Sequence, residues 1–452
     1  MVCCSAFGCS NRTDRKKSMD KCNITFHHLL RHIEMNSILT IPECDKILQR
    51  YRGSNDFTLT NYTIKSFSDT VNGFLSEYLL INISFQTKGV EKQKRFFAKR
   101  FPYQHELQSS YLISVKAYEN EICTYDVLFK EFNNLKGFTT DFAPKYYYSR
   151  KDLIILEDLS ELNYIIHPNP NELPLDHIKL SLKLLATFHS GSIGYQELKT
   201  GQLGRKYCLS EDYAICTQEP LFRKEDGFLG YSWFKGRLSA VNALIDLIPF
   251  PDITPKELKE KLLILTEEVF EIMKPTTKHY NVLCHGDMWG KNVMFQYENN
   301  VLSDAKLIDF QLQRYCPPAH DVLQFIFLTM NSERRKHYYN ELLLYYYNCL
   351  QDELKKSDFD LDDIIGYSDY EASINYLLPQ IKLQTMYYYT FQGPNQEFHK
   401  KVTSNVDDLK KFVFGDGAPF AIDLYNTDSN FRRLVTEALI ELKNLLVLRE
   451  KN

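Results

Sequence analysis

The sequence predicts an α+β fold of two lobes, a small β-rich lobe followed by a larger helical one. Between residues 57 and 69, β-branched and aromatic residues alternate roughly with polar ones, which is the period of a strand. Beyond residue 161, apolar residues recur at three- and four-residue spacing, which is the period of an amphipathic helix. A chain of 452 residues is long enough for one bilobal enzyme or for two or three domains.

The small lobe is predicted to span residues 35–160. Its predicted elements are strands at 57–69, 77–85, 95–100 and 152–159 and a helix at 115–129. Asn72-Gly73 is predicted to form the turn between the first two strands, because these residue types favour tight turns.

The larger lobe is predicted to span residues 161–452. Ile178, Leu182, Leu185 and Phe188 mark its first amphipathic helix. The sequence Thr254-Pro255-Lys256-Glu257 predicts the start of a second helix, with Thr254 as N-cap and Glu257 completing a capping box. Further helical stretches are predicted near 319–349, 371–390 and 429–449.

Composition excludes several classes of protein. The formal net charge of -4 argues against a general binder of nucleic acids or anionic membranes, since such proteins usually carry a basic surplus. No stretch approaches the roughly 20 consecutive apolar residues that a membrane span needs. The eleven cysteines are mostly scattered and the N-terminus lacks a secretory signal pattern, so a cytoplasmic protein is predicted. The sequence leaves the oligomeric state open.

The segment 282–310 carries most of the functional information. Residues 293–297 and 305–308 read as two strands joined by a turn at Glu298-Asn299-Asn300. If they pair as a hairpin, Asn292 and Asp309 meet at its open end, and Asp287 lies in the preceding loop. Amide and carboxylate oxygens are the ligands that Mg²⁺ prefers, and oxygen-bearing groups around one point suit phosphoryl transfer.

The spacing His285-x-Asp287-x-x-x-x-Asn292, followed by a strand-borne Asp309, is the catalytic-loop arrangement of kinase-like folds. Gly286 stands where a protein kinase has arginine, Gln311 replaces the glycine after Asp-Phe, and no Ala-Pro-Glu triplet follows. These departures favour a bilobal protein-kinase-like fold of the aminoglycoside- and choline-kinase branch. The competing interpretation is that these are ordinary turn residues, but the spacing and the flanking strands agree with each other.

The chain resembles the ecdysteroid kinase-like family, also called CHK kinase-like, from about Met35 to the C-terminus. The resemblance rests on HGDMWGKN, LIDFQLQRYCPPAHDVLQF, GFLSEYLLI, FFAKRFP, YENEICTY, IILEDL and LATFHSGS. It implies an ATP-dependent phosphotransferase that acts on a hydroxyl of a small organic molecule, such as an ecdysteroid or another lipophilic alcohol.

The resemblance also implies roles for single residues. Asp287 matches the catalytic aspartate, and Asn292 and Asp309 match the Mg²⁺ ligands. For ATP, the implied residues are the strand lysine Lys99, its helix partner Glu121, the hinge residues Glu157 and Leu159, and the lone glycine Gly73 of the phosphate-covering turn. His285 and Asp321 are implied to brace the loop.

Each assignment has a competitor in the sequence. Lys99 could be a solvated strand lysine, whereas its neighbour Arg100 should point to the opposite face. Glu121 competes with Glu119 on the same predicted helix. His189 is predicted to be a packed or capping residue. The tyrosine runs at 146–148, 345–347 and 387–389 are predicted to fill the core and grooves.

The first 34 residues differ from the rest. MVCCSAFGCSNR and the later ITFHHL resemble the start of a THAP-type zinc finger, a DNA-binding module, with Cys4 and Cys9 as the first ligand pair. No Cys-x-x-His pair follows to complete the tetrahedral site, and a half site cannot drive such a module to fold. We therefore expect residues 1–34 to be vestigial and disordered.

Removal of residues 1–34 should leave activity and melting temperature essentially unchanged, because this segment has no apolar periodicity with which to join a core. The measurement is a thermal melt and an activity assay of the truncated and full-length chains. A large drop in melting temperature on truncation would contradict the prediction.

Two other classes of function compete with the kinase. A kinase-like protein that binds a ligand without turnover is disfavoured because Lys99, Asp287, Asn292 and Asp309 are all present. A DNA-binding protein with a kinase-like tail is disfavoured by the missing zinc ligands. The expected partner is a hydroxylated small molecule, with no nucleic acid and no membrane.

Overall fold

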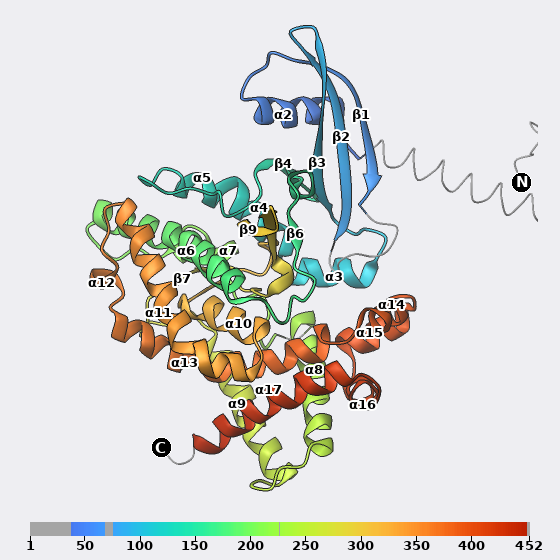
Figure 1. The fold of residues 1–452 in the computed structure, drawn as a ribbon, viewed down its shortest axis with the longest axis vertical. Helices are drawn as coiled ribbons and strands as arrows, with labels where there is room; N and C mark the ends of the chain where they lie inside the picture. The colour runs from blue at the N-terminus through green and yellow to red at the C-terminus, as the bar shows by residue number, and fades with distance from the viewer. Residues whose placement is uncertain (1–37, 68–75, 226, 450–452) are drawn as a thin grey trace, which may run out of the picture.

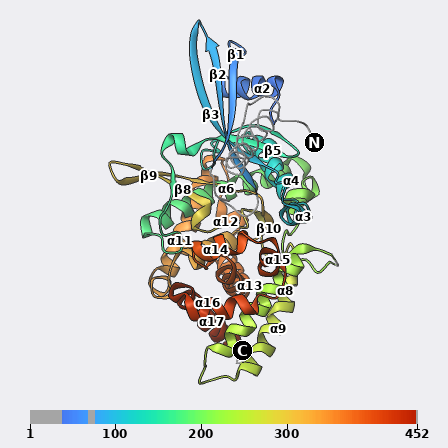
Figure 2. The same cartoon turned by 90° about the vertical axis from the view of Figure 1, so that its right-hand side faces the viewer.

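The computed structural model of the chain describes residues 38–67, 76–225 and 227–449. A β-rich lobe lies at the top of Figure 1 and a larger helical lobe lies below it; Figure 2 gives the side view. The predicted two-lobed α+β architecture is therefore confirmed. Residues 1–34 and Gly73 lie outside the described residues, so the predictions made for them stay predictions.

The small lobe is built on a five-stranded sheet of order β1-β2-β3-β5-β4, in which all neighbouring strands are antiparallel. The strands are β1 (Thr58–Ser66), β2 (Glu77–Thr87), β3 (Val90–Arg100), β4 (Tyr146–Arg150) and β5 (Leu153–Glu157). Buried and partly exposed residues alternate along β2, as expected for a strand with one face on a core. The strands predicted at 77–85 and 95–100 are confirmed within longer ones.

Helix α2 (Ile41–Arg52) packs on this sheet and was not predicted. The carboxylate of Glu43 accepts hydrogen bonds from the N–H (2.8 Å) and the hydroxyl (2.9 Å) of Thr40, which closes the first turn. Ile47 and Leu48 are fully buried in one cluster with residues of β1, β2, β3 and β5. The small lobe thus has a core of its own.

The helical stretch predicted near 115–129 is confirmed, since the chain is helical from Ala117 to Phe132 with a π-helical turn inside it, and a separate helix that was not predicted precedes it. The segments are α3 (Glu106–Ser114), α4 (Ala117–Cys123), a π-helical turn (Thr124–Leu128) and α5 (Phe129–Phe132). Val115 closes α3, and Lys116 has a φ of 54°, a left-handed conformation that no helix continues through. The new start at Ala117 puts Glu121 among the buried residues.

The strand predicted over 152–159 ends at Glu157. The side chain of Asp158 accepts a hydrogen bond from the N–H of Ser160 (2.9 Å) and starts a 3₁₀ helix, Leu159–Leu162. The predicted boundary between the lobes, near residue 160, falls in this 3₁₀ helix.

The larger lobe is mainly helical. Its helices are α6 (Leu175–Leu203), α7 (Ala214–Thr217), α8 (Leu229–Leu247), α9 (Pro255–Ile272), α10 (Ala319–Thr329), α11 (Ser332–Lys356), α12 (Leu361–Ile364), α13 (Tyr367–Gln392), α14 (Gln396–Thr403), α15 (Val406–Phe414), α16 (Ala418–Thr427) and α17 (Ser429–Leu448), with short 3₁₀ turns at Leu209–Glu211 and Gly290–Asn292. The predicted capping box at Thr254 and Glu257 is confirmed at the start of α9.

The helical stretch predicted near 319–349 is two helices. Helix α10 ends at Thr329, and the side chain of Asn331 accepts a hydrogen bond from the N–H of Arg334 (3.0 Å) to begin α11. The stretches predicted near 371–390 and 429–449 are confirmed as parts of α13 and α17, whereas α7, α8, α12, α14, α15 and α16 were not predicted.

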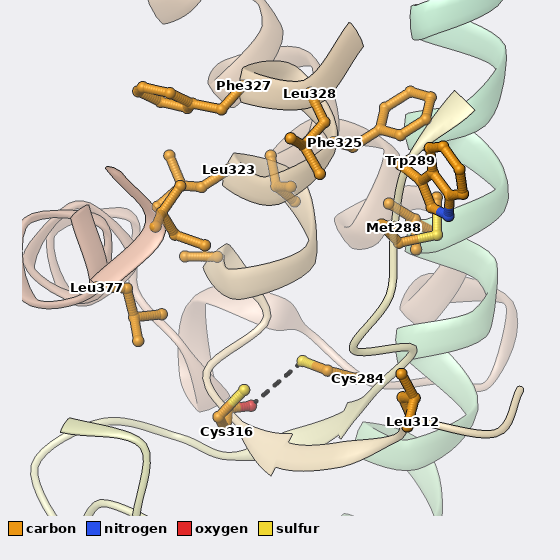
Figure 3. Packing of buried hydrophobic residues seen from close by; sticks show 14 of the residues in the cluster. Cys284, Met288, Trp289, Leu312, Cys316, Leu323, Phe325, Phe327, Leu328 and Leu377 are labelled. Carbon is orange, nitrogen blue, oxygen red and sulfur yellow. Dashed lines mark hydrogen bonds between the residues drawn. The ribbon is translucent and has the colours of Figure 1, made fainter. Parts of the chain in front are cut away.

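Short strands of the larger lobe carry the connections between its helices. They are β6 (Ile165–Ile166), β7 (Val282–Cys284), β8 (Val293–Glu298), β9 (Val301–Leu307) and β10 (Arg314–Cys316). Strand β7 pairs with β10, and Figure 3 shows the Cys284 thiol donating to the carbonyl oxygen of Cys316 across this pair. The predicted hairpin is confirmed, since β8 and β9 pair antiparallel from Val293 and Leu307 outward.

Over the part of the chain that the structure describes, no helix is both long and apolar enough to cross a membrane.

Candidate active site

The open end of the β8–β9 hairpin brings together the three oxygen-bearing residues predicted from the sequence. The N–H of Ile308 donates to the carbonyl oxygen of Asn292 (3.0 Å), which sets Asn292 beside Asp309. The Asn292 amide donates to the backbone oxygen (2.8 Å) and the carboxylate (3.0 Å) of Asp287. An aspartate, an asparagine and a second aspartate therefore face one region of the structure.

His285 is held in place through both ring nitrogens. Nε2 lies 2.9 Å from the carbonyl oxygen of Ile308 and must donate to it, because a carbonyl oxygen only accepts. Nδ1 then accepts from the N–H of Asp287 at 3.4 Å. His285 links the loop to the hairpin, which is the geometry that a bracing role requires.

Gly286 explains one departure from the protein-kinase pattern. Its φ is 79°, and a Cβ at this position would lie 2.0 Å from the carbonyl oxygen of Leu312. An L-residue would meet both a strained backbone and a fixed backbone atom. The arginine that protein kinases carry here cannot be accommodated, so the loop is built differently.

Asp321, from α10, binds the backbone of this loop. Its carboxylate accepts from the N–H of His285 (2.6 Å) and of Gly286 (2.9 Å), and His189 and His320 approach it at 3.1 and 3.2 Å. Burial alone would raise the pKa of Asp321, but the bonds from His189 and His320 outweigh it and hold the pKa well below its ordinary value. Asp321 is thus an ionised brace.

His189, Cys284 and Asp321 also place ligand-type atoms within 4.8 Å of one another. The contacts of these side chains are already made within the protein: His189 bonds to Tyr346 (2.6 Å) and the Cys284 thiol to backbone carbonyls. The cluster is a packed network around Asp321, in line with the packed role predicted for His189.

Asp321→Asn should lower the free energy of unfolding by about 3–5 kcal/mol, the range for removing one member of a buried charged network. The side chain is 0% exposed, and the amide would place N–H groups against N–H donors of the loop. Urea unfolding of wild type and variant measures the difference. Asp358→Asn, at a carboxylate that is 69% exposed beside Lys136, is the control and should change little.

The stabilisation that Asp321 gives to the fold depends on pH. Because the folded pKa of Asp321 is depressed, its stabilisation is complete above the ordinary aspartate pKa and is lost as the pH falls through the folded value. The difference between wild type and Asp321→Asn should therefore shrink only in strong acid. A difference that vanishes near neutral pH would contradict the assignment.

Lys99 on β3 connects the small lobe to the hairpin. Its ammonium group lies 2.5 Å from the Glu121 carboxylate and also pairs with Asp309. Lys99 is only 4% exposed, and burial alone would lower its pKa. The two carboxylates outweigh burial and raise the pKa well above its ordinary value, so the lysine is charged.

The competing residues on these elements point elsewhere. Arg100 bonds to Glu77 (3.3 Å) on β2, and Glu119 is exposed, whereas Glu121 is 1% exposed. The predicted strand lysine and its helix partner are therefore the residues that the fold brings to Asp309.

The two residues predicted to form the hinge lie where the sheet of the small lobe ends. Glu157 is the last residue of β5, and its N–H donates to the carbonyl oxygen of Lys145 (2.8 Å). Leu159 is buried at the start of the 3₁₀ helix, and the intervening Asp158 pairs with Arg95 of β3. Contacts of Glu157 and Asp158 thus hold the start of this connection against the small lobe.

The family model of ecdysteroid kinase-like proteins matches residues 70–359, which is more than half of the chain and includes every site residue predicted from the sequence. The chain belongs to the ecdysteroid kinase-like family. Together with the two-lobed architecture, membership assigns it a protein-kinase-like fold and, at a general level, a place among small-molecule phosphotransferases. Comparison with curated proteins found no match.

The solved structures that are similar to this chain share little sequence identity with it. An ethanolamine kinase of Plasmodium vivax is 14% identical with a TM-score of 0.37, covering 95% of this chain and 98% of that one. The GDP and kanamycin complex of APH(2")-IIia is 10% identical with a TM-score of 0.33, covering 86% and 100%. The GDP complex of wild-type aminoglycoside 2'-phosphotransferase-IIIa is 11% identical with a TM-score of 0.31, covering 83% and 97%.

The site residues of this ecdysteroid kinase-like chain suit a divalent cation. The Asn292 amide donates both of its bonds to Asp287, which turns its carbonyl oxygen to another side. Asp309 pairs with Lys99 through one carboxylate oxygen and accepts from Gln311 through the other (3.2 Å), with lone pairs left on both. An amide oxygen and a carboxylate at one point form the hard donor set that Mg²⁺ takes.

One functional contact was missed by the sequence reasoning. The hydroxyl of Tyr388, from α13, donates to Asp287 Oδ1 at 2.7 Å. The interpretation of residues 387–389 as packing alone is therefore wrong for Tyr388. Tyrosine is common in α13, and nothing in the sequence distinguishes this one, because its partner lies 101 positions away.

The electrostatics of Asp287 reflect these neighbours. Burial raises the pKa of this carboxyl above its ordinary value, and the nearby charge of Asp309 raises it further. The hydrogen bonds from Tyr388 and Asn292 act in the opposite direction, because they favour the ionised form. A carboxylate with a raised pKa is a better proton acceptor near neutral pH than an ordinary one.

Proposed function

We propose that this ecdysteroid kinase-like protein transfers the γ-phosphoryl group of ATP to a hydroxyl of a small organic molecule. The observation that carries the proposal is the grouping of Asp287, Asn292 and Asp309 at the hairpin end, with the buried Lys99 bound to Asp309. In this reading, residues 35–160 form the ATP-binding lobe, and residues 161–452 carry the catalytic loop, metal ligands and acceptor site.

Lys99 is the residue that would bind the phosphates of ATP. Glu121 keeps the ammonium group of Lys99 in place through the 2.5 Å ion pair. Glu157 and Leu159, at the end of the sheet, are proposed to lie against the adenine of ATP. Gly73 is assigned to the phosphate-covering turn from the sequence alone. Asn292 and Asp309 would hold Mg²⁺, which when bound neutralises charge on the phosphates.

Asp287 is the proposed base for the acceptor. An alcohol must lose its proton as it attacks phosphorus, and a carboxylate in hydrogen-bond reach orients the hydroxyl and accepts that proton. His285 is unavailable for this step, since Nε2 donates to Ile308 and Nδ1 accepts from the loop backbone. The family name supports ecdysteroids or other lipophilic alcohols as acceptors.

The test is transfer of labelled phosphate from ATP, with Mg²⁺, to members of a library of hydroxysteroids and other lipophilic alcohols. We expect acceptor-dependent transfer to at least one class of alcohol, and loss of transfer with Lys99→Met. The variant also serves as the control for a contaminating kinase, whose activity it would not change.

Two results would overturn the proposal. Binding of ATP without transfer to any alcohol would indicate a kinase-like ligand-binding protein. Transfer that persists undiminished in Lys99→Met would mean that the activity belongs to another protein or another site.

A further inference from the structure

Tyr388 is a residue of the larger lobe that reaches the catalytic loop from outside it. It belongs to α13, which packs against α8, α9, α10 and α17 and so has a fixed position in the lobe. Its ring lies 5.2 Å from that of Trp289, edge to face, and its hydroxyl lies 2.7 Å from Asp287 Oδ1. It also lies beyond residues 70–359, the part of the chain that the family model matches.

We propose that Tyr388 is a positioning residue for the acceptor reaction: its hydroxyl and the Asn292 amide together fix the orientation of the Asp287 carboxylate. The inference rests on the proposed function, in which Asp287 receives the proton of the acceptor hydroxyl.

The geometry that supports this role is a bond to each carboxylate oxygen. Tyr388 donates to Oδ1, and Asn292 donates to Oδ2 at 3.0 Å. Rotation of the carboxylate about its bond to Cβ would break both contacts at once. Each carboxylate oxygen accepts about two hydrogen bonds, so a place for the acceptor hydroxyl remains on either of them.

The two donors come from different parts of the chain. Asn292 belongs to the loop itself, whereas Tyr388 is anchored by α13 and by its contact with Trp289. Without Tyr388, Asp287 would be tied only to its own loop and could turn about a single bond. A base that samples several orientations spends less time in the reactive one, which lowers the rate of the chemical step.

Tyr388 remains a donor over the working pH range. Burial and the charge of Asp287 raise the pKa of its hydroxyl well above its ordinary value.

The test compares Tyr388→Phe with Tyr387→Phe. Each substitution removes one hydroxyl, and the two positions are adjacent in α13. The ring of Tyr387, however, packs on Trp233 and Phe234. We expect Tyr388→Phe to lower kcat by a factor on the order of 10, the effect of one hydrogen bond to a charged group, while KM for ATP stays the same. In the Asp287→Asn background, adding Tyr388→Phe should change kcat little, because a positioning residue has no effect once the base that it positions is gone. Tyr387→Phe should change neither quantity.

A second readout needs no substrate. In protein labelled with ¹³C in its aspartate carboxyls, the signal of Asp287 is identified by its loss in Asp287→Asn. At one fixed neutral pH, this signal should shift in Tyr388→Phe relative to wild type and stay in place in Tyr387→Phe, because the Tyr388 hydroxyl bonds to the carboxylate. Failure of the wild type to phosphorylate any alcohol counts against the proposed function alone, since this signal still reports on the contact between Tyr388 and Asp287.

Three results would overturn the inference. One is an unchanged kcat and an unchanged ¹³C signal of Asp287 in Tyr388→Phe. Another is a fall in kcat that accompanies a lower melting temperature and is equally large in the Asp287→Asn background, which indicates a structural role only. The third is a lower KM for the acceptor with the same kcat, which means that the Tyr388 hydroxyl occupies the acceptor's place.

Discussion

Asp309→Asn should lower turnover by a factor on the order of 10³ or more and leave the fold intact. The substitution removes charge but hardly any volume, and the metal that Asp309 is proposed to hold supplies several kcal/mol of charge stabilisation in the transition state. Lys99 would lose one of its two carboxylate partners but keep Glu121 at 2.5 Å. The fold should therefore tolerate the change better than the chemistry does.

The measurement is turnover as a function of Mg²⁺ concentration, together with a thermal melt. Asp304→Asn is a matched control on the same hairpin, because Asp304 is 40% exposed and bonds to Tyr164 (2.5 Å) away from the site. It should retain full activity. Unchanged turnover in Asp309→Asn would remove Asp309 from the metal site.

The β8–β9 hairpin was predictable because everything that forms it is local. Its strands alternate, and the turn residues Asn299 and Asn300 adopt φ values of 51° and 64°. Asparagine tolerates the left-handed conformation that such hairpin turns require. The turn predicts the hairpin, but a bulge between Gln296 and Tyr297 shifts the register by one residue before Val293 pairs with Leu307, and the sequence gives no signal for it.

Helix α3 and the break after it were not predictable in the same way. The left-handed residue there is Lys116, and a lysine gives no signal for positive φ. The predicted helical stretch begins near Val115, two residues from the start of α4, whereas α3 before the break was not predicted.

The run Tyr387-Tyr388-Tyr389 shows most clearly where sequence reasoning stops. Successive residues of a helix point about 100° apart, so the three side chains go to different places. Tyr387 packs on aromatic rings, Tyr388 reaches Asp287, and Tyr389 donates to the carbonyl oxygen of Phe327 (3.0 Å). Three identical residues have three surroundings, and each is decided by contacts distant in the chain.

Asp287→Ala should lower kcat by a factor on the order of 10²–10⁴, the usual share of general-base catalysis. KM for ATP should change little, because the nucleotide is proposed to be held by Lys99, the hinge and the metal ligands. The ring nitrogens of His285 are both occupied, so no neighbouring histidine can take over as base. Alanine also leaves the Tyr388 hydroxyl without its acceptor and removes one of the two acceptors of the Asn292 amide, so a melting curve must accompany the kinetics.

Asp287→Asn separates the loss of the base from the loss of packing. It keeps the size of the side chain and one acceptor oxygen, but it cannot accept a proton, so its kcat should fall nearly as far as that of alanine. In either background, adding Tyr388→Phe should cost much less than it does in wild type, because a positioning residue has no effect once the group that it positions is gone. If Asp287→Ala instead weakens ATP binding and leaves kcat unchanged, Asp287 is a nucleotide contact and another residue is the base.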